Sequence, residues 1–237
     1  MEASGYTTLN RQSGLLREMQ TIANNIANTA TTGFKQEGII FSEYVVGTEN
    51  GSSISMASGR VGNTSFLQGA LTRTGGMLDL AIEGDGFFLI ESPSGERLTR
   101  SGQFSLSAEG DLVTNDGYPV LDLGGAPIFL PPGDGSLLIA SDGTISRDGA
   151  LLGQVGVYQP SDPLQLVREG GVSFNSQSGF EPVNEPNMRQ GFLENSNVNP
   201  VLQMARMIEV HRAYEMGQSF LDAENQRMRD ALRTFVK

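Results

Sequence analysis

Apolar residues recur every seven positions at both ends of the chain, and this spacing constrains the fold more than any other feature. Near the C-terminus an unbroken series runs through Met207, Tyr214, Leu221, Met228 and Phe235. Val210 lies three residues after the first member of this series. At the N-terminus the same interval separates Leu9, Leu16 and Ala23, with Met19 and Ile26 three residues further on. A narrow stripe of this period is typical of helices that pack as in a coiled coil.

The ends of these two helices can also be placed. The first is expected to end near Asn28, because residues 29–33 are rich in threonine and close with a glycine. Asn199 and Pro200 suit the cap and first turn of the second, which would then run roughly 50 Å to Phe235. The two helices could pair within one monomer. Stripes this narrow, beside so little other apolar surface, favour partners from neighbouring chains.

The middle of the chain indicates β structure. It holds most of the 30 glycines and every proline except Pro200. Asp-Gly pairs, which are turn signals, begin at positions 85, 116, 134, 142 and 148. The β-rich runs lie at 78–82, 87–91, 103–106, 119–121, 128–130, 137–140 and 151–158. Their spacing predicts antiparallel strands in a sandwich or a partly open barrel.

The predicted fold class is therefore α+β. Long N- and C-terminal helices would form a coiled-coil-like assembly domain, and the centre would form a mostly antiparallel β domain. We expect the chain to divide into four segments: an N-terminal helix in 1–35, an extended connector in 36–70, a β-rich outer domain in 71–190 and a C-terminal helix in 191–237. The connector is expected because residues 46–70 are rich in glycine, serine and asparagine.

Composition excludes much of the enzyme repertoire. Cysteine is absent and His211 is the single histidine, so thiolate and multi-histidine metal sites are excluded. A net charge of −11 argues against binding nucleic acid. Glu83 and Asp85 could be imagined as a catalytic pair, but a solvated turn explains them more simply. We expect no enzyme activity, cofactor or metal. We also expect no signal peptide and no membrane insertion, because apolar segments of the required length are missing.

Several motifs, in this order along the chain, resemble those of the bacterial flagellar rod and hook proteins. ANNIAN at 23–28 precedes TGFK at 32–35, and LDLAIEGDGFF follows at 78–88. The next matches are TRSGQF at 99–104, GDLVT at 110–114 and GYPVL at 117–121. QGFLENSNVN at 190–199 and the pair MIE and RAYE at 207–215 complete the pattern. The signature positions are Asn24, Asn25, Asn28, Gly33, Phe34, Gly84 and Gly86.

Two departures leave the family resemblance intact. Residues 29–31 replace the commoner valine-asparagine-threonine, and Ile26 stands where leucine is frequent. The compact length and the element at 197–201 resemble the proximal rod proteins of the family. A distal rod or hook subunit is the alternative within the family.

The resemblance implies a structural subunit of the rod, the drive shaft that carries torque from motor to hook. It implies helical assembly through the apolar positions of the two terminal helices, with copies of the chain and other proximal and distal rod proteins as partners. It further implies export without a cleaved signal through the flagellar type III apparatus, a place in the periplasmic part of the basal body, and neighbourhood to the P- and L-ring bushing. Phe41 and Val45 have the spacing proposed for contact with the export gate, although a plain β-strand explains them equally well.

Two readings from other classes remain open at this point. A secreted β-rich carbohydrate-binding protein would require clustered aromatic residues beside a carboxylate pair, but the chain has no tryptophan and five tyrosines. A coiled-coil adaptor in the cytoplasm would form a discrete helical oligomer.

Overall fold

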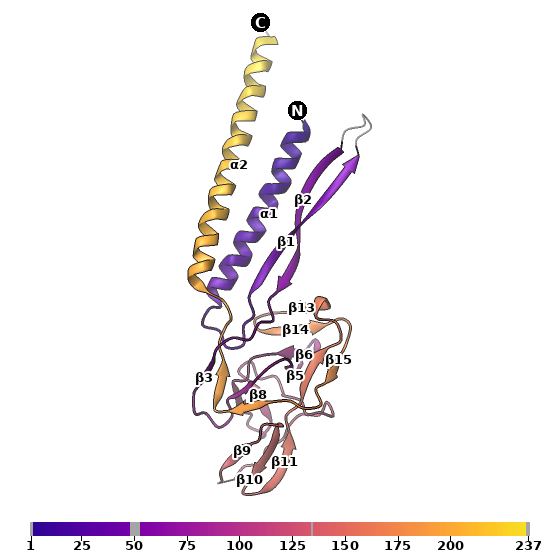
Figure 1. Ribbon diagram of the computed structural model, residues 1–237, viewed down its shortest axis with the longest axis vertical. Helices are drawn as coiled ribbons and strands as arrows, with labels where there is room; N and C mark the ends of the chain where they lie inside the picture. The colour runs from indigo at the N-terminus through magenta and orange to yellow at the C-terminus, as the bar shows by residue number, and fades with distance from the viewer. Residues whose placement is uncertain (1, 48–52, 134, 236–237) are drawn as a thin grey trace. The chain divides into compact units, whose positions relative to one another are not determined.

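The two ends of the chain meet in one unit, and the middle of the chain forms a second (Figure 1). The computed structural model describes residues 2–47, 53–133 and 135–235, with side chains for 7–40, 62–133 and 135–233. Unit 1 comprises Met1–Thr29, Gln36–Ser65 and Val198–Lys237. Unit 2 comprises Ala30–Lys35 and Phe66–Asn197.

Unit 1 contains the two α-helices found among the described residues, α1 (Glu2–Ala27) and α2 (Pro200–Phe235), which lie side by side and antiparallel (Figure 1). The start of α2 is capped as expected. The side-chain oxygen of Asn199 accepts hydrogen bonds from the backbone N–H groups of Val201 (3.1 Å) and Leu202 (3.2 Å). Two backbone donors that lack partners within the helix are satisfied in this way.

A β-hairpin packs against α1 in the same unit (Figure 1). Strand β1 (Glu37–Gly47) pairs antiparallel with β2 (Ser53–Thr64), from Glu37 opposite Thr64 to Gly47 opposite Ser53. The register shifts once, between Ile40 and Phe41. The first strand is rich in β-branched and aromatic residues, which favour this conformation.

The predicted fold class is wrong about the ends of the chain. They do not form a coiled-coil-like domain of two long helices alone, because the β1–β2 hairpin covers α1 within the same unit. The helices also differ in length, at 26 residues for α1 and 36 for α2. The distal part of α2 therefore extends past α1, and Met228 and Leu232 there are exposed. The hairpin occupies much of the stretch that was expected to be an extended connector.

Unit 2 is an antiparallel β domain. Its largest sheet has the order β13 (Leu166–Arg168), β14 (Ser173–Ser176), β6 (Gly95–Thr99), β5 (Phe87–Ser92), β12 (Val157–Pro160) and β15 (Phe180–Pro182). A three-stranded sheet has the order β11 (Ala150–Gln154), β10 (Thr144–Arg147) and β9 (Leu137–Ile139). Three strand pairs and a short 3₁₀-helix complete the unit: β16 (Met188–Gln190) with β4 (Leu80–Ile82), β17 (Phe192–Glu194) with β3 (Leu71–Arg73), β7 (Phe104–Leu106) with β8 (Leu112–Thr114), and η1 (Pro163–Gln165).

Strand β5 is buried on both faces and separates the two hydrophobic clusters of unit 2. Phe88 and Ile90 belong to one cluster, together with residues such as Leu112. Phe87 and Leu89 belong to the other. Successive side chains of a strand point to opposite faces, so one short apolar strand supplies both cores.

Candidate assembly site

Helices α1 and α2 meet along an apolar seam. Leu15 and Ile22 of α1 and Val210 of α2 are buried in it. Five half-buried side chains pack against these three: Met19, Ile26, Met207, Ala213 and Tyr214. On α1 the seam follows intervals of three and four residues from Leu15 to Ile26, which is the spacing that keeps one helix face against a partner.

Polar contacts flank the seam and fix the alignment of the two helices. Near one end, Gln12 Nε2 donates to the backbone carbonyl of Tyr214 at 2.9 Å. In the middle, Arg206 Nε donates to Glu18 Oε1 at 2.8 Å. This hydrogen bond is the main reason that the pKa of Arg206 is raised. A charge-assisted contact of this kind favours a single register between the helices.

Asn25 connects α1 to the start of the hairpin. Its Nδ2 donates to the backbone carbonyl of Glu37 at 2.7 Å, and its Oδ1 accepts from the backbone N–H of Glu37 at 3.0 Å. Nδ2 also lies 3.3 Å from Gln203 Oε1 on α2. The buried amide thus satisfies both backbone groups of Glu37 and contacts all three parts of unit 1.

The predicted interface residues fall into different environments. Val210 is buried, and Met19, Ile26, Met207, Tyr214 and Leu221 are half-buried. Leu9, Leu16 and Met228 are exposed. Phe235 is the last residue of α2, and its side chain lies outside the described residues. Sequence reasoning missed Leu15 and Ile22, which the spacing of three and four residues through Met19 could have revealed.

Sequence reasoning also missed an exposed apolar face near the start of α2. Val201, Met204 and Ile208 are 72%, 54% and 54% exposed. Their spacing of three and four residues places them on one side of the helix. At 100° per residue, this side is opposite to Val210 and thus to α1. An apolar stripe on the solvent side of a helix is typical of an interaction surface.

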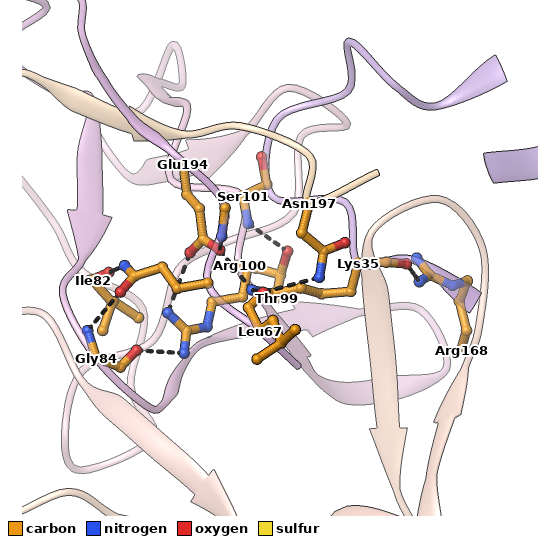
Figure 2. Close-up of polar contacts among 12 residues, drawn as sticks. Lys35, Leu67, Ile82, Gly84, Thr99, Arg100, Ser101, Arg168, Glu194 and Asn197 are labelled. Atoms are coloured by element: carbon orange, nitrogen blue, oxygen red, sulfur yellow. Dashed lines mark hydrogen bonds and ion pairs between the residues drawn. The ribbon is translucent and has the colours of Figure 1, made fainter. Parts of the chain in front are cut away.

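A buried charge cluster in unit 2 holds together segments that are distant in the sequence (Figure 2). Lys35 Nζ donates to Glu194 Oε1 at 2.6 Å, and Arg100 Nη1 donates to Glu194 Oε2 at 3.2 Å. Arg100 Nη2 also donates to the carbonyl of Gly84 at 2.7 Å. Burial lowers the pKa of Lys35 and of Arg100, while the Glu194 carboxylate opposes that shift in both groups.

The cluster lies within unit 2 and involves the segments that adjoin unit 1 in the sequence. Glu194 Oε1 accepts from the backbone N–H of Gly69 at 2.9 Å, and Lys35 Nζ donates to the carbonyl of Leu67 at 2.9 Å. Asn197 Nδ2 donates to the same carbonyl at 2.9 Å (Figure 2). The contacts therefore join 33–35, 67–69 and 194–197, the three segments of unit 2 next to its boundaries with unit 1. Both oxygens of the Glu194 carboxylate have partners, whereas the buried Arg100 Nε has none among the described residues. The shared carboxylate thus restricts the arrangement of the three segments.

The signature residues have structural roles around these two regions. Asn28 Nδ2 donates to the carbonyl (2.9 Å) and to the side-chain oxygen (2.8 Å) of Asn24, at the end of α1. Phe34 is buried under the Arg168 guanidinium, whose carbon lies 4.3 Å from the ring centroid. Gly84 supplies the carbonyl that Arg100 binds.

Two signature glycines meet a steric requirement. Gly33 has φ +71°, and a Cβ atom there would lie 2.4 Å from the backbone nitrogen of Ser101. Gly86 has φ +124°, and its Cβ would lie 2.5 Å from a methyl group of Val157. Other residues strain the backbone at such angles and would clash here.

Phe41 and Val45 lie in β1, opposite Gly59 and Ser55 of β2. Their side chains lie outside the described residues. Neither α1 nor α2, as far as each is described, combines the length and apolarity that crossing a membrane requires. Within the described residues, no three acidic or histidine side chains are grouped so that they could hold a metal ion.

Comparison with known proteins identifies the family. Residues 6–35 match the family model for the flagella basal body rod protein. Residues 81–147 match the model for the flagellar hook protein FlgE/F/G D1 domain. Residues 189–234 match the model for the flagellar basal body rod FlgEFG protein C-terminal region. The flagellar basal-body rod protein FlgF of Mesorhizobium japonicum is 41% identical over 218 residues, covering 91% of this chain and 90% of the relative. FlgF of Caulobacter vibrioides is 38% identical over 245 residues, covering 100% and 99%.

The chain belongs to the flagellar basal-body rod protein family. Within this family, FlgG of Bacillus subtilis is 31% identical over 259 residues, covering 95% of this chain and 96% of the relative. The expected resemblance to the proximal type of rod protein, FlgF, is confirmed by the higher identity of the FlgF sequences. The chain is a structural subunit of the flagellar rod. Its relatives are named as rod proteins, which accords with a role other than catalysis.

Proposed function

We propose that this rod subunit assembles helically through unit 1 and carries torque from the motor toward the hook. The observation that supports this most strongly is the exposed apolar face of Val201, Met204 and Ile208. Burial of apolar surface contributes about 25 cal/mol per Å². Repeated along a helical array, such contacts would hold neighbouring subunits firmly.

In this proposal the predicted interface residues have two tasks. The exposed side chains of Leu9, Leu16 and Met228 contact neighbouring subunits. The seam residues, such as Val210 and Met207, act within the monomer by holding α1 against α2. The alignment of the two helices then determines the surface that each subunit offers to the next.

The neighbours in the proposal are copies of this chain and other proximal and distal rod proteins. Contacts between them are heterologous and do not close, so that the assembly grows as a helix. We place the assembled subunit in the periplasmic part of the basal body, where unit 2 could meet the P- and L-ring bushing. The negative charge, which is concentrated in the middle of the chain, would keep unassembled subunits soluble.

Export through the flagellar type III apparatus without a cleaved signal completes the proposal. The absence of cysteine suits passage as an unfolded chain into an oxidising compartment. Phe41 and Val45 are the proposed contacts with the export gate. Replacing both with alanine should reduce secretion of the chain into the periplasm while its cytoplasmic level is maintained. Unchanged secretion would contradict the role of these two residues.

The assembly proposal is tested by placing charge on the exposed apolar face. Met204→Asp combined with Ile208→Asp should abolish motility and leave the isolated chain as helical as the wild type by circular dichroism. Ser219→Asp is the matched control, because Ser219 is an exposed polar residue of the same helix. Normal motility of the double variant would show that this face is not an interface.

A further inference from the structure

A groove of about 330 Å³ runs between α1 and α2 within unit 1. Its α1 wall extends from Thr8 to Leu15 and its α2 wall from Ala213 to Phe220. Each wall spans seven residue steps, or roughly 10 Å at 1.5 Å per residue. We call this feature the Gln12 groove, after the polar residue that lines it.

Gln12 has an unsatisfied hydrogen-bond acceptor. The residue is only 7% exposed, and its Nε2 donates to the backbone carbonyl of Tyr214. Oε1 is buried and has no hydrogen-bond partner among the described residues. A buried acceptor without a partner costs free energy. The cost would be relieved by an occupant of the groove whose donor reaches Oε1 once the Gln12 amide turns toward it.

Gly217 leaves room for the glutamine side chain. A Cβ atom at position 217 would lie 2.4 Å from Gln12 Nε2, so any side chain there would displace the amide. Glycine in the interior of a helix is unfavourable. Gly217 lies seven residues after Val210, and its position opposite Gln12 accounts for the absence of a side chain there.

The rim of the groove is apolar and open. Met216 is 67% exposed and Phe220 is 43% exposed. A matching occupant therefore carries apolar side chains about 10 Å apart along a helix, with a hydrogen-bond donor between them. One face of α1 has this composition, because Leu9, Ser13 and Leu16 are exposed and share one side of the helix.

We propose that the Gln12 groove of one subunit receives the Leu9–Ser13–Leu16 face of another copy of the chain, with the Ser13 hydroxyl donating to Gln12 Oε1. Leu9 and Leu15 are six residues apart, which is about 120° around the helix. The face thus lies outside the groove of its own subunit. Groove and face are different surfaces, so the contact is head-to-tail and repeats without closing. The inference rests on the proposed function and names the residues that would meet.

Disulfide trapping tests the contact directly, because the chain has no cysteine of its own. Two differently tagged full-length chains, one with Ser13→Cys and one with Met216→Cys, are expressed together, and basal bodies are purified and mildly oxidised. Position 13 is the middle of the face, and position 216 lies on the rim near the middle of the α2 wall. The pair therefore meets whether the two helices run parallel or antiparallel. A disulfide-linked dimer that carries both tags is expected.

Gln218→Cys replaces Met216→Cys in the control. Gln218 is exposed on α2 but does not line the groove, and the heterodimer should be lost. Rods that contain both tagged chains without the Ser13–Met216 disulfide would overturn this inference and leave the proposed function standing. Absence of the wild-type tagged chain from purified rods would instead overturn the proposed function.

A second experiment tests whether the Ser13 hydroxyl acts as the hydrogen-bond donor. Ser13 is exposed in the monomer, so Ser13→Ala and Ser13→Thr should both leave the fold unchanged. Ser13→Ala is expected to reduce swimming on soft agar, because the donor is lost, and Ser13→Thr should retain it. Equal swimming of the two variants would contradict the role of the hydroxyl.

Discussion

Lys35 donates a 2.6 Å hydrogen bond to Glu194, a residue 159 positions further along the chain, and both side chains are 1% exposed. Glu194 also accepts from Arg100, so one carboxylate is shared by two cations. The contact joins segments of unit 2 that are next to its boundaries with unit 1 in the sequence.

Removing the charge of Glu194 should weaken unit 2. Glu194→Gln leaves Lys35 and Arg100 buried without an anion, and the free energy of unfolding is expected to fall by roughly 3 kcal/mol. Urea unfolding of the full chain measures the loss. Glu181→Gln is the control, because Glu181 is exposed and should have little effect. Equal stability of the two variants would show that the cluster does not hold the unit together.

The contribution of Tyr158 to the stability of the chain should change at alkaline pH. Burial raises the pKa of Tyr158, helped by the charges of Asp122 and Glu96, and its hydroxyl donates to the carbonyl of Asp122 at 2.6 Å. Because the folded-state pKa is above the unfolded one, this stabilisation is complete below about pH 10 and is lost as pH rises through the folded-state pKa. Tyr158→Phe should lower stability by about 1 kcal/mol at neutral pH. The difference from wild type should shrink in alkaline solution, and a constant difference would contradict this account.

Gly217 and Gln12 should be energetically coupled. Alanine is about 1 kcal/mol better than glycine inside a helix. In the Gln12→Ala background, Gly217→Ala should therefore stabilise the chain by about that amount. With Gln12 present the gain should vanish, because the added methyl group displaces the amide that binds Tyr214. Thermal unfolding of the four chains gives the coupling energy, and a value near zero would mean that the two residues act independently.

Asn25 should govern the attachment of the hairpin to α1. Asn25→Asp keeps the acceptor for the backbone N–H of Glu37 but loses the donor to its carbonyl, which should cost about 1–3 kcal/mol. Amide exchange in β1 should become faster than in wild type. Gln20→Ala, an exposed change on the same helix, is the control. Unchanged exchange in β1 would show that the amide does not anchor the strand.

The helices and the central β domain could be read from the sequence, because their periodicity and turn signals are local. The register of α1 could not be read as easily. Leu9 and Leu16 suggested one stripe, whereas Leu15 and Ile22 form the seam, and the polar Gln12 interrupts the true series. The actual face of the helix depends on what packs against it.

The hairpin and the charge cluster were harder to predict for different reasons. β2 is rich in serine and glycine, which are poor strand formers, and it becomes a strand through its pairing with β1. The contact between Lys35 and Glu194 depends on the folded arrangement of segments far apart in the chain. Single residues of this kind carry no local signal of their partners.

Electron microscopy of basal bodies from a strain that lacks the gene tests whether this chain is an axial subunit of the rod. We expect rods that stop short of the distal segment, together with loss of motility. Wild-type chain and Ser219→Asp should restore both, and the Met204→Asp, Ile208→Asp chain should not. Complete rods and normal motility without the gene would show that the chain is not an axial subunit.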